Sequence, residues 1–278
     1  MRALSGKKEP EQVADALIWH PDVRRMLLTQ KAIAEGGRAM VYGASKIADK
    51  MFNAVTEGDK AAYKKYDDEL GFYTPILKGF LTEMGLEAAN LGIQVFGGHG
   101  YIGEHGMEQI ARDARISTLY EGTTGIQALD LLGRKVLLNT KGKCVRDFSG
   151  TILRMVKPYA LQRTPMGQMM RTLARRTAQW NVLTTLIMLR ASKDREQVGS
   201  SSVDYLMYSG FVMMAYFWAL QAAKATELLA SGKGKESNDF YTAKIQTAEF
   251  YFARLLPRAD GHYSAALAPT SAVMQMPQ

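Results

Sequence analysis

The sequence of 278 residues contains only one cysteine, Cys144. A single cysteine excludes an internal disulfide and argues against a zinc ion held by several cysteines. A lone thiol is typical of proteins from a reducing compartment, so we expect a cytoplasmic protein. The first ten residues are polar and basic, and we therefore expect no secretory signal there.

Strand patterns are also missing, because no stretch alternates apolar and polar residues as a half-buried strand does. Hydrophobic residues make up 47% of the chain and charged residues 22%, which is ordinary for a soluble globular protein. Sixteen methionines favour an adaptable helical core. The sequence therefore predicts an all-α fold.

No basic run with interleaved aromatic residues is present, although the formal net charge is +8. Residues 1–140 contain 17 Lys and Arg against 18 Asp and Glu, whereas residues 141–278 contain 18 against 9. The basic excess is scattered through helical patterns, so we expect no nucleic-acid binding. A basic surface could attract the phosphate groups of a small ligand or keep the chain soluble.

One stretch lacks charge altogether, from Tyr205 to Ala223. Its 19 residues are long enough to span a membrane, but they include Tyr, Ser, Gly and Gln. A central bundle helix that is buried nearly all round explains this composition better. We therefore expect no membrane span.

Apolar residues at helical spacing predict an antiparallel bundle of four helices in residues 21–140, after an N-terminal loop over residues 1–20. Asp22 is the expected N-cap of the first helix, and Pro75 is expected in the first turn of the second. The polar residues 141–150 are expected to link this bundle to a second helical domain, residues 151–278. The predicted main helices cover residues 23–55, 75–95, 107–119, 125–138, 166–191, 202–230 and 238–256.

A break between two helical patterns places Glu121 in a corner. Gly122 is expected to stop the helix of residues 107–119, and Thr124 with Gln127 has the spacing of a capping box that starts the next helix. From the residues alone, two interpretations remain. Glu121 is either a solvated carboxylate near a helix N-terminus or a general base flanked by apolar residues that could raise its pKa.

A glycine-dense loop, Gly97-Gly98-His99-Gly100-Tyr101, precedes that helix. Its glycines allow either a close approach of backbone to a ligand or a sharp helix–helix corner. It is not a Rossmann loop, because no strand precedes it. His99, Glu104 and His105 do not have a recognised zinc spacing, so we expect no metal site.

The ordered combination of QVFGGHGY, residues 94–101, and ARDARISTLYEGTTGIQALDLLGRK, residues 111–135, is specific. It resembles the C-terminal helical domain of the acyl-CoA dehydrogenases, flavoenzymes that oxidise acyl-CoA thioesters to enoyl-CoA. The resemblance extends back through residues 21–49. The second half is similar, more loosely, to the extra helical domain of longer bacterial types such as the 3-methylmercaptopropionyl-CoA dehydrogenases. We assign no site to that half.

The resemblance implies roles for individual residues around the corner. Glu121 matches the catalytic base that removes the α-proton of the thioester while a hydride leaves the β-carbon for FAD. The backbone N–H of Glu121 matches a donor to the thioester oxygen. Tyr120 and Gly122 match the substrate pocket, and Thr123 matches a cofactor contact. Gly125 stands where the family often has a cofactor-binding Gln, so no contact is expected from it.

Gln94, Gly97 and Gly98 match the segment that contacts the FAD of a neighbouring subunit, which implies a homo-oligomer. The resemblance also implies acyl-CoA as substrate and an electron-transfer flavoprotein as a partner. The N-terminal helical and β domains of the family, and its early Arg-x-x-Phe-Gly segment, have no counterpart in this sequence. We therefore expect a C-terminal fragment that is inactive alone. The alternative is a non-catalytic helical interaction module.

Overall fold

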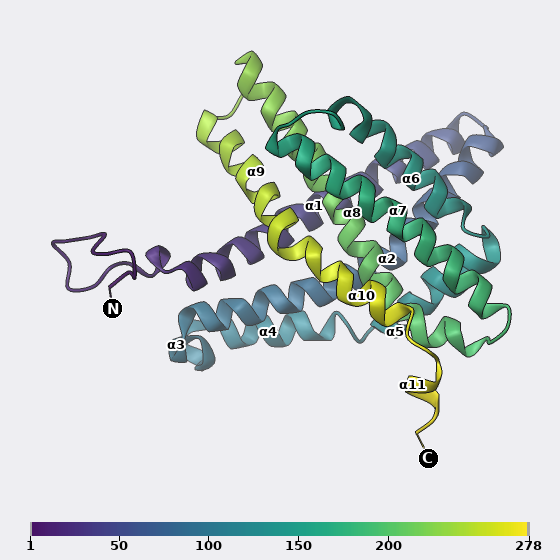
Figure 1. Cartoon of the computed structure of the whole chain (residues 1–278), viewed down its shortest axis with the longest axis horizontal. Coiled ribbons are helices and arrows are strands. Elements are labelled where there is room, and N and C mark those ends of the chain that lie inside the picture. Colours follow the sequence, from purple (N-terminus) through teal and green to yellow (C-terminus); the bar gives the residue numbers. More distant parts are fainter. Residues whose placement is uncertain (1, 277–278) are drawn as a thin grey trace.

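The computed structural model describes residues 2–276, and within this range the chain forms helices and no strand. This confirms the all-α prediction. Two long helices, α1 (Pro21–Thr56) and α2 (Lys60–Phe96), form an antiparallel hairpin (Figure 1). Between them Gly58 has a left-handed φ of 70°, and the Asp59 carboxylate caps α2 by accepting the N–H groups of Ala61 and Ala62.

The other helical segments are mostly shorter. The short turns η1, η2, η4 and η6 are 3-10 helical, and η3 and η5 are π-helical continuations of α5 and α9. In chain order the segments are η1 (Leu17–Trp19), α3 (Gly98–Tyr101), η2 (Gly103–His105), α4 (Met107–Ile116), α5 (Thr124–Leu129), η3 (Asp130–Asn139), α6 (Lys143–Val156), η4 (Lys157–Tyr159), α7 (Pro165–Ala191), α8 (Glu196–Ser231), α9 (Asn238–Phe250), η5 (Tyr251–Leu255), η6 (Leu256–Arg258), α10 (Ala259–Ala266) and α11 (Ser271–Met274).

The predicted start of the second helix was wrong, because Pro75 lies in the middle of α2 and not in its first turn. A proline nitrogen cannot donate to the carbonyl four residues earlier. Here the hydroxyl of Thr74 donates to that carbonyl, on Gly71, at 3.4 Å. The polar residues 60–70 form the first turns of α2, and their composition hid the apolar period that would have predicted them.

The predicted cap of the first helix was also wrong. His20 occupies the N-cap position of α1 and its side chain makes no capping hydrogen bond. Pro21 is the first helical residue, where its missing N–H costs nothing. Asp22 lies in the first turn and accepts a hydrogen bond from Arg25 at 2.8 Å.

The polar segment over residues 141–150 is mostly helical. α6 begins at Lys143, after Gly142 with a φ of 76°, and it buries Val145 and Phe148. One cluster of buried apolar side chains continues from α1 and α2 through α10. The division into two domains at residues 141–150 stays a prediction.

α8 is the central helix. It lies against α1, α2, α5, α7, α9 and α10, and its residues from Tyr205 to Ala215 are all buried. By length and composition α8 could cross a membrane, but 78% of its most apolar window is buried within the protein. Trp218 on α8 donates to the carbonyl of Ala32 on α1 at 3.1 Å, next to Gly36, where a Cβ atom would lie 2.5 Å from the indole nitrogen.

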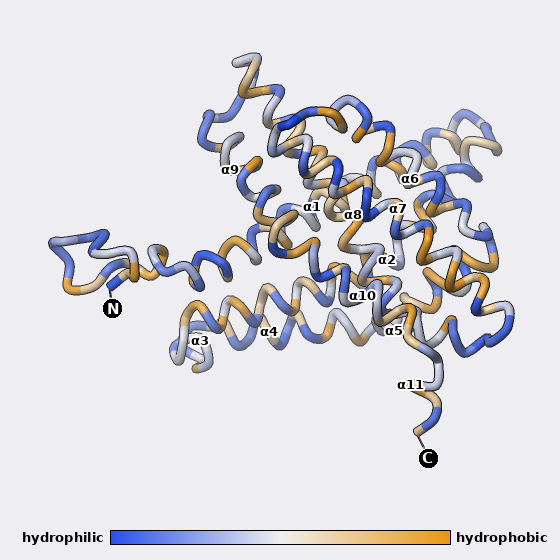
Figure 2. Tube along the Cα trace, in the orientation of Figure 1, coloured by the Kyte–Doolittle hydropathy of each residue, from blue (hydrophilic) through white to orange (hydrophobic). Residues whose placement is uncertain are grey.

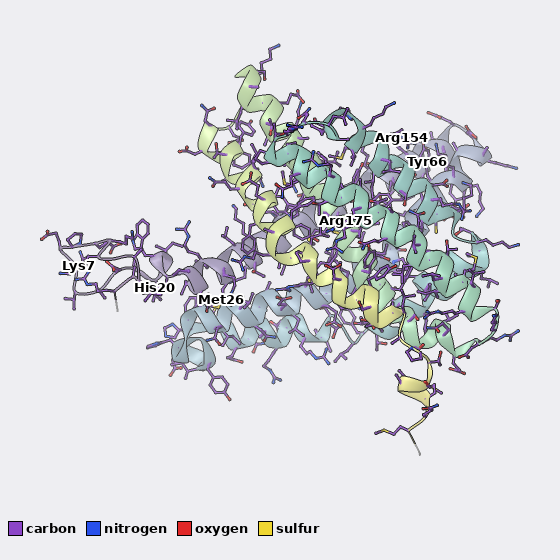
Figure 3. The ribbon with its side chains drawn as sticks, in the orientation of Figure 1. Lys7, His20, Met26, Tyr66, Arg154 and Arg175 are labelled. Atoms are coloured by element: carbon purple, nitrogen blue, oxygen red, sulfur yellow. The ribbon has the colours of Figure 1, made fainter. Side chains whose placement is uncertain are left out.

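Besides the C-terminal segment with α11, two segments extend from the packed helices (Figure 1). The end of α2, α3 and α4 form an arm along which apolar and polar residues alternate closely (Figure 2). The N-terminal loop forms the other extension, and Figure 3 shows Lys7, His20 and Met26 in order along it and into α1. Asp15 organises this loop, since its carboxylate accepts hydrogen bonds from the backbone N–H groups of Ala3, Lys8 and Glu9.

Candidate functional site at the Glu121 corner

The Glu121 corner, residues 117–127, begins where α4 ends in a turn. Glu121 has a φ of 52° and Gly122 a φ of 93°, so two successive residues adopt left-handed backbone conformations. Glycine does this freely, but for a glutamate it costs on the order of 1–3 kcal/mol. Such strain persists only where the surroundings enforce it, and it is most often found at functional sites.

The helix after the corner starts one residue earlier than the sequence predicts. Thr123, and not Thr124, is the N-cap of α5, and its hydroxyl accepts the N–H of Ile126 at 3.4 Å. The side chain of Gln127 reaches back and donates to the carbonyl oxygen of Glu121 at 3.3 Å. A Cβ atom on Gly122 would lie 2.6 Å from that amide nitrogen and would displace the Gln127 side chain, while the φ of 93° itself favours glycine.

Glu121 offers a carboxylate and a backbone N–H at the surface of the protein. The residue is exposed, and neither group has a hydrogen-bond partner within residues 2–276. Large apolar side chains close to it in the sequence are also exposed, including Ile116 at 55% exposure and Tyr120 at 52%. The corner therefore presents an acceptor and a donor on an open apolar surface.

Charged residues on α2 hold both sides of the corner. The ammonium of Lys78 donates to the carbonyl of Ser117 at 2.5 Å, and the carboxylate of Glu83 accepts the hydroxyl of Thr124 at 2.5 Å. No motif in the sequence singled out Lys78 or Glu83. A charge pattern could have drawn attention to them: residues 75–95 contain only three charged residues, Lys78, Glu83 and Glu87.

Within the arm, the glycine loop forms the turn between α2 and α4. Gly97 ends α2 with a φ of 62°, and Gly100 is buried so close to α2 that a Cβ atom would collide with the carbonyl of Ile93. Gly97 and Gly98 are exposed, with open space where their Cβ atoms would be, and Gln94 is exposed as well.

The structure does not bring the two predicted groups of site residues together. Glu121, Tyr120, Gly122 and Thr123 form one end of the arm, while Gln94, Gly97 and Gly98 lie beyond the other end of α4 (Figure 1). The ten residues of α4 separate them by about 15 Å along the helix axis.

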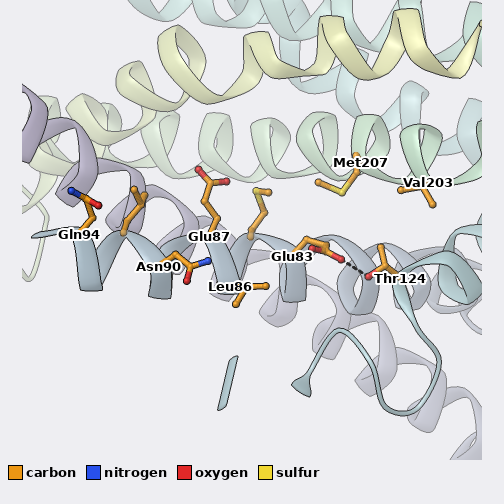
Figure 4. A pocket seen from close by; sticks show the side chains of 10 residues that line it. Glu83, Leu86, Glu87, Asn90, Gln94, Thr124, Val203 and Met207 are labelled. Atoms are coloured by element: carbon orange, nitrogen blue, oxygen red, sulfur yellow. Dashed lines mark hydrogen bonds between the residues drawn. The ribbon is translucent and has the colours of Figure 1, made fainter. Parts of the chain in front are cut away.

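An open groove of about 740 Å³ runs along α2 between these two ends (Figure 4). Its polar wall includes Gln94 at one end and Thr124, bonded to Glu83, at the other. Its apolar wall comes partly from α8. The groove is lined by Glu83, Met84, Leu86, Glu87, Asn90, Leu91, Gln94, Thr124, Val203 and Met207. The sequence could not predict it, because Val203 and Met207 are distant in the chain from the motifs.

No cluster of three or more His, Cys, Asp or Glu residues that could hold a metal ion occurs in the described part of the chain. The rings of His99 and His105 contact each other edge to face, with centroids 5.3 Å apart. The two histidines therefore pack against each other, His99 from the glycine loop and His105 from η2.

Two family sequence profiles match nearly the whole chain. Residues 2–137 match the "Acyl-CoA dehydrogenase, C-terminal domain" and residues 148–277 the "Acetyl-CoA dehydrogenase C-terminal like" family. Among curated proteins, the 3-methylmercaptopropionyl-CoA dehydrogenase of Ruegeria pomeroyi is 36% identical over 91% of this chain and 42% of its own length. The broad-specificity linear acyl-CoA dehydrogenase FadE5 of Mycobacterium tuberculosis is 34% identical over 86% of this chain and 39% of its own.

A solved structure shares the fold. The acyl-CoA dehydrogenase of Bacillus anthracis, which was crystallised with FAD, superposes with a TM-score of 0.69 at 17% identity, over 91% of this chain and 44% of that one. The matches lie in the C-terminal helical families of the acyl-CoA dehydrogenases. The chain belongs to the acyl-CoA dehydrogenase family, and it spans about two-fifths of the length of these curated relatives.

Proposed function

We propose that this chain is the C-terminal helical part of an FAD-dependent acyl-CoA dehydrogenase and that Glu121 is its catalytic base. The observation that carries the proposal is the geometry of the corner. Glu121 is exposed in a left-handed backbone conformation, and neither its carboxylate nor its backbone N–H has a hydrogen-bond partner within residues 2–276. Both groups are therefore available to a ligand.

The corner suits the removal of an α-proton from a thioester. The Glu121 carboxylate would accept the proton, and the Glu121 N–H would donate a hydrogen bond to the thioester oxygen, where negative charge develops. Water must be excluded for a carboxylate to do this. Tyr120 and Gly122 would line the substrate side of the pocket, and the exposed apolar residues around the corner supply a wall for the acyl chain.

The residues assigned to FAD could contact one side of the cofactor, but they do not enclose it. The exposed Gly97 and Gly98 leave their backbone open to close approach, with the amide of Gln94 beside them, and Thr123 borders the corner. When bound, FAD would supply the acceptor for the hydride from the β-carbon. Because α4 separates Gln94 from Glu121, the glycine segment would serve the site of a neighbouring subunit, which supports a homo-oligomer.

The test uses a chimera that joins this chain to the part of the Ruegeria pomeroyi relative that it does not match. We expect the chimera to retain flavin absorbance after desalting and to oxidise acyl-CoA with an artificial electron acceptor. Glu121→Gln should keep the flavin and lower turnover by about 10²–10⁴-fold, the usual contribution of a general base. Glu104→Gln, an exposed glutamate of the same arm, is the matched control and should change neither.

Undiminished turnover in Glu121→Gln would refute the assignment of the base. The chain alone should also be incubated with FAD and desalted, since a retained flavin band would show that these helices suffice for binding. A second candidate function is a non-catalytic helical interaction module, favoured by the exposed apolar residues of α4. A flavin-loaded chimera without turnover would support it.

A further inference from the structure

Two charged side chains of α2 interact with the Glu121 corner instead of forming ion pairs. Lys78 and Glu83 are both half-buried, and neither is within salt-bridge distance of an opposite charge among residues 2–276. Half-buried charges are costly unless they are compensated by hydrogen bonds. By contrast Glu87, one turn after Glu83 on the same helix, forms two hydrogen bonds of 2.8 Å with Arg258.

The compensation comes from the two segments that flank Glu121. Before it, the Lys78 ammonium donates to the Ser117 carbonyl at 2.5 Å and lies 5.4 Å from the centroid of the Tyr120 ring. After it, Glu83 accepts the hydroxyl of Thr124. Hydrogen bonds with one charged partner are about twice as strong as neutral ones, so these contacts suit the enforcement of a strained turn.

Gly79 brings the corner close enough to α2 for both contacts. A Cβ atom on Gly79 would lie 3.4 Å from Cβ of Gln127 on α5 and 2.6 Å from Cδ1 of Leu206 on α8. Gln127 in turn donates to the carbonyl of Glu121. α2 therefore contacts the corner on both sides of the strained residue.

We propose that Lys78 and Glu83 are positioning residues that fix the Glu121 corner against α2, and that Lys78 also orients the Tyr120 ring. Their catalytic meaning rests on the proposed function of Glu121. The contacts themselves can be tested without catalysis. Lys78 acts through Ser117 and Tyr120, and Glu83 through Thr124, so neither needs to touch the substrate.

Hydrogen–deuterium exchange of the whole chain tests the contacts directly. We expect Lys78→Met and Glu83→Gln to speed the exchange of amides in residues 117–127 by about tenfold, while exchange in α7 and α8 stays unchanged. Lys78→Arg should restore slow exchange, because a guanidinium can both donate to Ser117 and stack on Tyr120. Lys64→Met and Glu87→Gln are matched controls on α2 that leave the corner as slow as in the parent.

Three results would overturn the proposal: unchanged exchange of the corner in Lys78→Met and Glu83→Gln, faster exchange spread evenly over the chain, or no restoration by Lys78→Arg. In the flavin-loaded chimera, Lys78→Met should lower kcat by about tenfold with little change in KM, and Lys78→Arg should recover it. If Glu121→Gln keeps its turnover while Lys78→Met still loosens the corner, the proposed function fails and the positioning role stands. If the corner is unaffected while Glu121→Gln is inactive, only the positioning role fails.

Discussion

α8 and the Glu121 corner differ in how much of their apolar surface the rest of the chain covers. Between Tyr205 and Ala223, α8 has no charge, and nearly all of its side chains are covered by six other helices. α4 mixes apolar and charged residues and buries no side chain, and Ile116 at its end and Tyr120 in the corner remain about half exposed. The apolar side chains of α8 are covered by other helices of the same chain, whereas those of the corner stay partly exposed. Exposed apolar patches of this kind mark surfaces for ligands or other protein parts.

The backbone differs in the same way. Among residues 2–276 the non-glycine residues with positive φ are Glu121 and Lys141, and neither is in the core. Both residues are exposed, and Glu121 lies at the open corner. The left-handed non-glycine residues and the packed core are therefore separated in space.

The largest effect on stability should come from Trp218 on α8. Its ring is fully buried and its N–H bonds to Ala32, so Trp218→Ala should lower the free energy of unfolding by about 3–5 kcal/mol. Ile116→Ala, at the exposed end of α4, should change it by less than about 0.5 kcal/mol. Urea unfolding followed by circular dichroism measures both. A loss in Ile116→Ala as large as in Trp218→Ala would mean that the α4 surface is part of the folding core.

A smaller effect, with opposite signs at adjacent residues, is expected at the corner. Gly122→Ala places a Cβ atom against the Gln127 amide at a φ of 93°, so it should destabilise the chain by roughly 1–3 kcal/mol. Glu121→Gly removes left-handed strain, but glycine also gains freedom in the unfolded chain, so the net result should be neutral or stabilising by up to about 1 kcal/mol. The same unfolding experiment compares them. Clear destabilisation by Glu121→Gly would argue against strain at this residue.

These two regions also show how far the sequence predicts the molecule. The uncharged run in α8 predicts a buried helix, because burial on all sides needs apolar residues on all sides. Gly122 and the helical patterns around it predict the break at Glu121. The positions of Lys78 and Glu83 against the corner depend on how α2 packs on α5, which no local pattern encodes.

Two errors have local physical causes. The exposed first turns of α2 have a polar composition, and Thr74 replaces the hydrogen bond that Pro75 cannot make, so the proline did not mark a helix start. The second error is the cap of α1: Pro21 needs no partner for an N–H, so the helix starts there and Asp22 lies in its first turn.

The smallest and most local effect should be found in the N-terminal loop, which is held by a polar centre and not by apolar packing. Hydrogen bonds from the N–H groups of Ala3, Glu9 and Lys8 hold the pKa of Asp15 well below its usual range. A carboxylate with a lowered folded-state pKa stabilises the fold above its unfolded pKa of about 4 and loses this contribution as pH falls through the folded value. We therefore expect the loop to be ordered at pH 7 and to loosen below about pH 4.

Asp15→Asn should loosen the loop at pH 7 already, because a neutral amide accepts these hydrogen bonds more weakly than a carboxylate. The measurement is the backbone amide NMR signals of Ala3, Lys8 and Glu9, followed in the parent chain from pH 7 downward and in the variant at pH 7. Asp22→Asn, which removes an exposed partner of Arg25, is the control and should leave these three signals in place. Signals that stay the same in Asp15→Asn would mean that backbone turns, and not the carboxylate, order the loop. In that case the structure of the loop, like that of the uncharged α8, would not depend on a charged side chain.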